Sequence, residues 1–112
     1  MTMLAEELEA RRAASDARTP EVTAAAMAQS LRILEESGAA GRALGVGDVA
    51  PDFTLPDAAG RAISLSGLLT TGPVAVSFYR GAWCPYCNLE LRALQEAFPG
   101  IRDAGATLVA IS

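Results

Sequence analysis

The sequence contains no histidine, no lysine and only two cysteines, and each of these shortages excludes a kind of site. Without histidine, a cysteine nucleophile activated by an imidazole is ruled out. A tetrahedral zinc site needs about four nitrogen, sulfur or oxygen ligands, so two cysteines would require a second copy of the chain to complete it. Long uncharged apolar runs are also lacking, and a membrane span is therefore not expected. We expect no metal and no cofactor.

Positive charge is scarce as well. The 9 basic residues are all arginine and are outnumbered by 13 acidic ones, which gives a net charge of -4. Such a chain repels nucleic acid and anionic lipid, so neither nucleic acid nor a membrane is expected as a partner. The first residues lack the basic start and apolar stretch of a signal peptide. Together with two cysteines in one reactive spacing, this predicts a reducing, cytoplasmic compartment.

What the sequence does contain is a Cys-Pro-Tyr-Cys motif, Cys84 to Cys87, after the apolar run 74–79 and a short loop. Pro85 suits the first turn of a helix, where its missing N–H costs nothing. A thiol at a helix N-terminus meets unpaired backbone N–H groups and the positive end of the helix dipole, and both favour thiolate. Cys87 follows one turn later on the same helix face, within reach of an adduct on Cys84. The motif favours thiol redox chemistry over half of a zinc site or a pair of buried structural cysteines.

Residues 1–45 are rich in alanine and predict an N-terminal helical extension. One helix is expected through about Ser15. A second begins where Thr19 offers a capping hydroxyl and Pro20 suits the first helical position, and Gly38 is expected to end it. The extension shows no spacing of catalytic residue types. Its expected role is therefore packing on the rest of the chain or on a second subunit, the alternative being a solvated extension.

Residues 46–112 predict an α/β body. A short extended segment over 50–57 is followed by a turn and by a second short strand over 61–65. Ser66 is then expected to cap a short helix. This part of the body should form a small antiparallel pair of strands.

The remainder of the body predicts a strand, a helix and a second strand. The apolar runs 74–79 and 107–112 are the strands, and the helical connection makes them parallel neighbours. In the helix, apolar residues recur every three or four positions from Cys87 to Ile101. Pro99 falls inside that stripe and is expected to kink or split the helix.

The order of these motifs resembles the AhpC/TSA peroxiredoxin superfamily. The resemblance rests on Ala-Pro-Asp-Phe-Thr-Leu-Pro-Asp at 50–57, Val-Ala-Val-Ser-Phe-Tyr at 74–79, the cysteine helix, and Gly-Ala-Thr-Leu-Val-Ala-Ile-Ser at 105–112. The likeness is nearest to a peroxiredoxin-like branch with a Trp-Cys-Pro-x-Cys site. It implies a thioredoxin-like α/β fold, of which this chain would hold the N-terminal βαβ half, preceded by the helical extension.

The resemblance also implies an activity. The chain would be an antioxidant thiol peroxidase that reduces hydrogen peroxide and organic hydroperoxides. Cys84 matches the family's peroxidatic cysteine, which is oxidised to sulfenic acid, and Cys87 is the candidate resolving cysteine. Thioredoxin or a similar dithiol protein would reduce the oxidised pair.

Three neighbours of Cys84 are candidates for supporting roles. Arg80 would favour the thiolate or attract peroxide, the alternative being a solvated loop arginine. Trp83 matches the tryptophan that precedes thioredoxin's site and would shield the thiol, the alternative being ordinary surface packing. Tyr86 stands as in glutaredoxin's Cys-Pro-Tyr-Cys and would tune the redox potential and the docking of partners, the alternative being a partly exposed aromatic.

Two departures from typical peroxiredoxins leave other interpretations open. Gly81 stands where those members carry a threonine that hydrogen-bonds the peroxide, and the loop from Phe78 to Cys84 is shorter, closer to thioredoxin's. Both favour a thioredoxin- or glutaredoxin-like dithiol–disulfide oxidoreductase. Family members also continue well beyond the last strand of this chain. This predicts a third alternative, a truncated remnant with impaired catalysis that pairs its open sheet in a homodimer.

Overall fold

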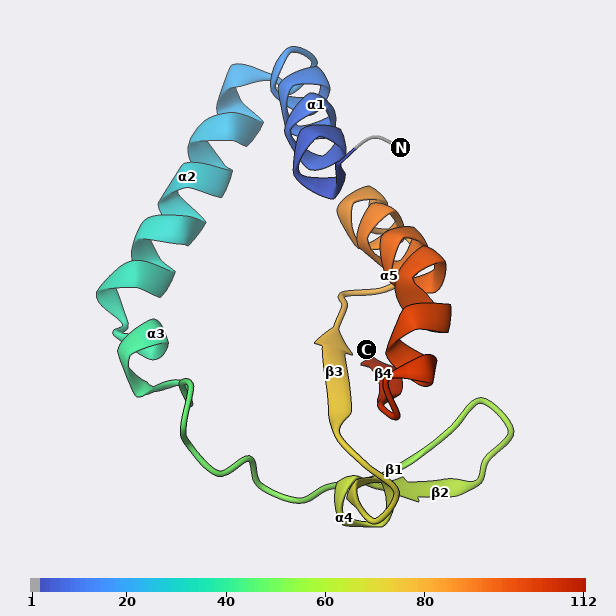
Figure 1. The fold of residues 1–112 in the computed structure, drawn as a ribbon. Helices are drawn as coiled ribbons and strands as arrows, with labels where there is room; N and C mark the ends of the chain where they lie inside the picture. The colour runs from blue at the N-terminus through green and yellow to red at the C-terminus, as the bar shows by residue number, and fades with distance from the viewer. Residues whose placement is uncertain (1–2) are drawn as a thin grey trace. The chain divides into compact units, whose positions relative to one another are not determined.

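A computed structural model describes residues 3–112, and their contacts divide the chain into two units. One is Ala5–Ala50, and the other is Pro51–Ser112 together with Met3 and Leu4. Each unit is described by itself. The regular elements of the first are all helices, and the second combines strands with helices (Figure 1).

The N-terminal region forms the helices that its composition predicts: α1 (Leu4–Asp16), α2 (Glu21–Glu36) and the short α3 (Ala39–Arg42). The expected cap at the start of α2 is wrong. Pro20 takes the N-cap position, and the hydroxyl of Thr19 donates back to the carbonyl oxygen of Ser15 at 2.7 Å. A threonine that follows a helix can bond to the carbonyl four residues earlier, and here that bond wins over capping.

Gly38 ends α2 as predicted. The helix is followed by Ser37, and Gly38 then adopts the left-handed conformation with φ of 70°. This conformation is favourable for glycine because it has no β-carbon, and it lets the last turn close before α3 begins.

The second unit begins with the predicted antiparallel pair, β1 (Thr54–Pro56) and β2 (Ala62–Ser64). One aspartate organises the turn between them. The carboxylate of Asp57 accepts hydrogen bonds from the backbone N–H groups of Ala59 and Arg61, each at 2.9 Å, and from the Arg61 side chain at 3.0 Å. The turn is therefore held by side-chain-to-backbone bonds that aspartate forms readily.

Helix α4 (Leu65–Leu69) starts two residues earlier than a cap at Ser66 would place it. Ser64, the last residue of β2, is the N-cap, and its hydroxyl accepts from the backbone N–H of Gly67 at 3.1 Å. Ser66, predicted as the cap, lies inside the first turn. Its N–H and its hydroxyl both donate to the carboxylate of Asp52, at 2.9 and 2.8 Å. That aspartate connects the segment before the hairpin to α4. Ser64 therefore takes the cap position that was expected for Ser66.

The Cys-Pro-Tyr-Cys motif is carried by a parallel pair of strands and the helix between them. Strands β3 (Val74–Phe78) and β4 (Thr107–Ile111) are parallel neighbours, as predicted, in a register that pairs Val76 with Val109. Helix α5 (Pro85–Asp103) connects them and packs against β4 (Figure 1). With the helical region before it, this arrangement is consistent with a partial thioredoxin-like α/β fold.

Helix α5 is a single helix that includes Pro99, so of the two expected effects, a kink or a split, the split is wrong. An interior proline removes one backbone hydrogen bond and costs about 3 kcal/mol in an isolated helix. In this protein α5 packs against β4, and Leu91, Leu94 and Phe98 lie on the side of the helix that faces Leu108 of that strand. Packing of the stripe on the strand keeps the helical path through the proline.

Candidate active site

Cys84 lies where the loop after β3 enters α5. It occupies the N-cap position with extended backbone angles, φ -87° and ψ 112°, and its carbonyl oxygen accepts from the N–H of Asn88 at 3.1 Å. Pro85 follows in the first turn, as predicted. The side chain is buried, with 3% of its surface exposed. The sequence therefore places a thiol at a helix N-terminus and beneath the surface.

The surroundings of this thiol favour its ionised form. A hydrogen bond from the Cys87 side chain is the largest cause that lowers the pKa of Cys84, and the backbone N–H of Cys87 is the next. Burial opposes them, because it disfavours the charged form. The N–H of Tyr86 and the positive charge of Arg80 add smaller effects, and the pKa of Cys84 is held below its ordinary value.

Cys87 lies one helical turn after Cys84 and is half-buried. Both cysteines are free thiols. The backbone N–H of Arg80 donates to Sγ of Cys87 at 3.4 Å. The second thiol is thus held between the loop and the first cysteine, and the two sulfur atoms form the pair that the motif predicts.

The loop between β3 and α5 is stabilised by Asn88, which the sequence analysis did not single out. Its side-chain amide donates to the carbonyl oxygen of Ala82 at 2.9 Å, and the N–H of Cys84 donates to the carbonyl oxygen of Gly81 at 3.0 Å. A polar side chain in the first turn after a loop is the only signal of this role in the sequence. The two bonds fix the path of the chain into Cys84.

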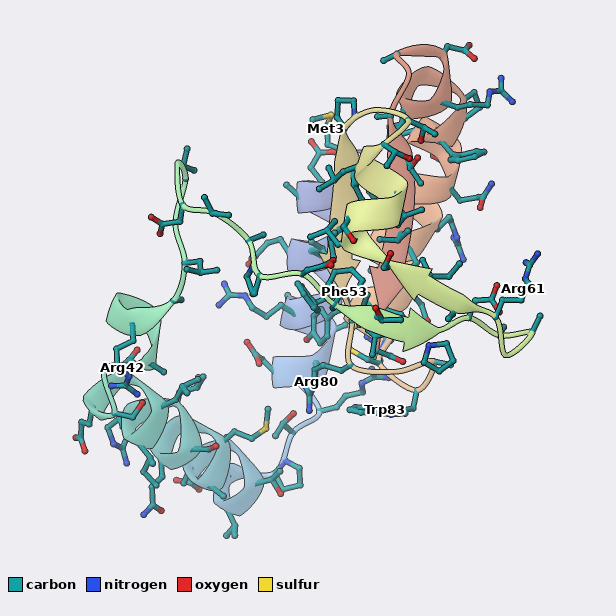
Figure 2. The ribbon with its side chains drawn as sticks, turned by 90° about the horizontal axis from the view of Figure 1, so that it is seen from below. Met3, Arg42, Phe53, Arg61, Arg80 and Trp83 are labelled. Carbon is teal, nitrogen blue, oxygen red and sulfur yellow. The ribbon has the colours of Figure 1, made fainter. Side chains whose placement is uncertain are left out.

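The predicted supporting residues lie on this same loop and helix start. The guanidinium carbon of Arg80 is 4.9 Å from the centre of the Trp83 ring, and Figure 2 labels the two residues close to each other. Trp83 is 68% exposed, so its ring lies at the surface beside the buried thiol. Tyr86 is half-buried in the first turn of α5. The structure gathers all of these residues around Cys84.

An apolar hollow of about 630 Å³ lies between the β1–β2 hairpin and the C-terminal ends of β3 and β4. Neither cysteine lines it, and of the site loop only Tyr79 contributes to its wall. The hollow is therefore adjacent to the loop without containing Cys84.

Over 3–112, no cluster of three or more histidine, cysteine, aspartate or glutamate side chains is arranged to hold a metal ion. Within the same residues, no helix combines the length and the hydropathy needed to cross a membrane.

Comparison with known proteins identifies the family. The model of the AhpC/TSA family matches residues 46–112, and the chain belongs to that family, which confirms the resemblance. The chain is 39% identical over 66 residues to chloroplastic peroxiredoxin Q of Oryza sativa subsp. japonica, a match that covers 59% of this chain and 30% of that protein. It is 34% identical over 70 residues to the thiol-disulfide oxidoreductase ResA of Geobacillus thermodenitrificans, covering 62% of this chain and 39% of that protein.

The chain thus spans well under half the length of these two relatives. One of these relatives is named as a peroxiredoxin and the other as a thiol-disulfide oxidoreductase. No solved structure matches the chain.

Proposed function

We propose that this chain carries the thiol centre of a peroxiredoxin-type peroxidase that reduces hydrogen peroxide and organic hydroperoxides. One observation carries the proposal. In the segment that matches the AhpC/TSA family, Cys84 occupies the start of α5 with its pKa lowered, chiefly by the hydrogen bond from Cys87. A thiolate is the reactive form of cysteine, so this position is prepared for nucleophilic attack.

The reaction has two steps in the protein. The thiolate of Cys84 attacks the terminal oxygen of the peroxide, the O–O bond breaks, and the leaving alkoxide or hydroxide takes a proton to become alcohol or water. Cys84 is then a sulfenic acid. The thiol of Cys87 condenses with it, a disulfide forms, and water is released.

A reductant must return the disulfide to two thiols. We propose thioredoxin or a similar dithiol protein in a reducing, cytoplasmic compartment. One thiol of that protein would attack the disulfide and its second thiol would release the mixed disulfide, leaving the partner oxidised. The positive charge of Arg80 supports the thiolate in the first step, and Pro85 starts the helix that aims backbone N–H groups at it.

The test is to trap the sulfenic acid. The Cys87→Ser variant is treated with stoichiometric hydrogen peroxide and then with dimedone, and the labelled residue is identified by mass spectrometry. We expect a dimedone adduct on Cys84 and loss of one equivalent of peroxide. The Cys84→Ser variant is the matched control and should give neither. Absence of the adduct together with unconsumed peroxide in Cys87→Ser would reject the peroxidase.

A second candidate function is a dithiol–disulfide oxidoreductase. The specific observation in its favour is the close pairing of Cys84 and Cys87 on one helical turn, next to Gly81 where typical peroxiredoxins have a threonine. Cys84 would attack a protein disulfide and release one thiolate, and Cys87 would displace the second cysteine and close the disulfide in this chain. Reduction of insulin disulfides without peroxide turnover would favour this function, and the reverse pattern would reject it.

A further inference from the structure

The loop before Cys84 holds two exposed side chains in a defined contact. The guanidinium carbon of Arg80 is 4.9 Å from the centre of the Trp83 ring, which is the geometry of a cation–π interaction (Figure 2). Both side chains are exposed. At the surface, a long arginine side chain samples many rotamers unless a neighbour restricts it. The aromatic ring is that neighbour here.

Gly81 determines where the ring can lie. A β-carbon built on Gly81 would overlap the indole nitrogen Nε1 of Trp83 and would come within 2.9 Å of its Cδ1 atom. The backbone at Gly81 also has a positive φ of 153°. The ring therefore lies directly against the backbone of this glycine, in space that any side chain at this position would occupy. A threonine here, as in typical peroxiredoxins, is incompatible with this position of the ring.

The backbone of this loop is bonded to both cysteines. The carbonyl oxygen of Gly81 accepts from the N–H of Cys84 at 3.0 Å, and the N–H of Arg80 donates to Sγ of Cys87 at 3.4 Å. The ionisable groups that affect the pKa of Cys84 are Cys87 and Arg80, and the positive charge of Arg80 lowers it. The ring thus contacts the guanidinium of the residue whose backbone N–H bonds to Cys87 and whose charge favours the Cys84 thiolate.

We propose that Trp83 is a positioning residue: its indole, seated against Gly81, holds the Arg80 guanidinium where it stabilises the Cys84 thiolate. This inference rests on the proposed function only in taking Cys84 as the nucleophile. It holds equally for a peroxide or a disulfide substrate, since both are attacked by the thiolate. Gly81 is then required because it leaves room for the indole that positions Arg80. Typical family members have a threonine at this position, and in this chain the indole and Arg80 take its place beside Cys84.

The experiment measures how fast iodoacetamide alkylates Cys84 as a function of pH, with the modified residue assigned by fragment-ion mass spectrometry. The variants are Gly81→Ala, Trp83→Ala and Arg80→Gln, singly and in pairs, in the full chain. At pH values below the pKa of Cys84, each single change is expected to slow alkylation about two- to threefold, which is the effect of one partly screened charge. In the double variants, the alkylation rate of Cys84 is expected to fall no further than in the single variants, because all three changes remove the same interaction.

Gly60→Ala is the matched control. Gly60 also has a positive φ, 82°, but a β-carbon there meets nothing within 4 Å. This variant adds a β-carbon to a residue with positive φ, as Gly81→Ala does, but leaves the Trp83 ring in place. Its alkylation profile should therefore match that of the unchanged chain. Fluorescence gives a second readout, because Trp83 is the single tryptophan and Arg80→Gln should change its emission.

Two outcomes overturn the proposal. One is an unchanged alkylation profile in Trp83→Ala. The other is a double variant of Trp83→Ala and Arg80→Gln whose decrease in alkylation rate is the combined decrease of the two single variants. Both changes are at exposed side chains, so this comparison remains decisive where Gly81→Ala disturbs folding. A failed peroxidase assay with the expected alkylation pattern would reject the proposed peroxidase and leave this inference standing.

Discussion

At the scale of single residues, the chemistry depends on a few donors directed at one sulfur atom. Cys84 is buried, which alone would raise the pKa of its thiol, and yet hydrogen bonds from Cys87 and from backbone N–H groups of α5 lower it. The order of these causes matters. The second cysteine stabilises the first as a thiolate before any oxidation takes place, in addition to its proposed part in forming the disulfide.

This gives a prediction that separates the two roles of Cys87. In Cys87→Ala, the loss of the hydrogen bond should raise the pKa of Cys84 and slow its alkylation below that pKa by about tenfold, the effect of one hydrogen bond to a charged group. Cys87→Ser keeps an O–H donor and should lose much less, although neither variant can form the disulfide. Alkylation rates over pH, followed by mass spectrometry, measure both. Equal rates in the alanine and serine variants would contradict the donor role.

The residues of the site were predictable to different degrees. Cys84, Cys87 and Pro85 were predictable because a helix start after a strand is encoded in a short stretch of sequence. The contact between Arg80 and Trp83, and the bond from Asn88 to the loop, were not. They depend on loop dihedral angles, which composition and periodicity do not specify.

At the scale of elements, long periodic segments were easier to predict than their ends. The parallel strands and α5 follow from apolar runs and a single helical stripe. The caps do not: Ser64 caps α4 in place of Ser66, because Asp52, 14 residues before Ser66, binds the second serine. A partner so distant in sequence decides between two similar hydroxyls, and a local pattern cannot show it.

Asp52 also predicts a pH dependence for the second unit. Its pKa is lowered chiefly by the backbone N–H of Ser66 and then by the Ser66 hydroxyl. Burial raises it by less than either bond, and the N–H of Phe53 lowers it slightly further. The folded pKa lies below the unfolded one. The carboxylate therefore stabilises the fold fully above its unfolded pKa of about 3.9, and this contribution is lost as the pH falls through the folded value.

Asp52→Asn should accordingly lower the free energy of unfolding near pH 7 and flatten its decrease at acidic pH. Urea denaturation followed by circular dichroism, at about pH 7 and about pH 3, measures this difference. Some pH dependence should remain, because the pKa of Asp57 is lowered too, chiefly by the backbone N–H of Arg61. Ser66→Ala keeps the backbone N–H donor, so it should lower the free energy of unfolding by less than Asp52→Asn does. Identical pH dependence in the unchanged chain and in Asp52→Asn would contradict the prediction.

At the scale of the whole molecule, little apolar surface is fully covered. Among residues 3–112, the buried hydrophobic side chains are Leu65 and Cys84. The strands form two separate two-stranded sheets, so each strand has one neighbour. Small cores give marginal stability, and unpaired strand edges invite pairing with another chain. The fold class and the open sheet edge are predictable from the sequence, whereas which side chains are buried becomes visible only when the elements are placed in space.

The open edge of β3 therefore predicts concentration-dependent self-association of the chain. Gel filtration with light scattering should show a rising average mass with concentration, and the melting temperature should rise with it, since association stabilises the folded state. Ala75→Lys places a charge at an exposed position of β3 and should keep the chain monomeric, because edge lysines oppose strand pairing. Ala26→Lys adds the same charge at an exposed position of α2 and should leave association unchanged. A mass that stays monomeric at all concentrations, with a cooperative melt independent of concentration, would show that the two-stranded sheet is stable without a partner.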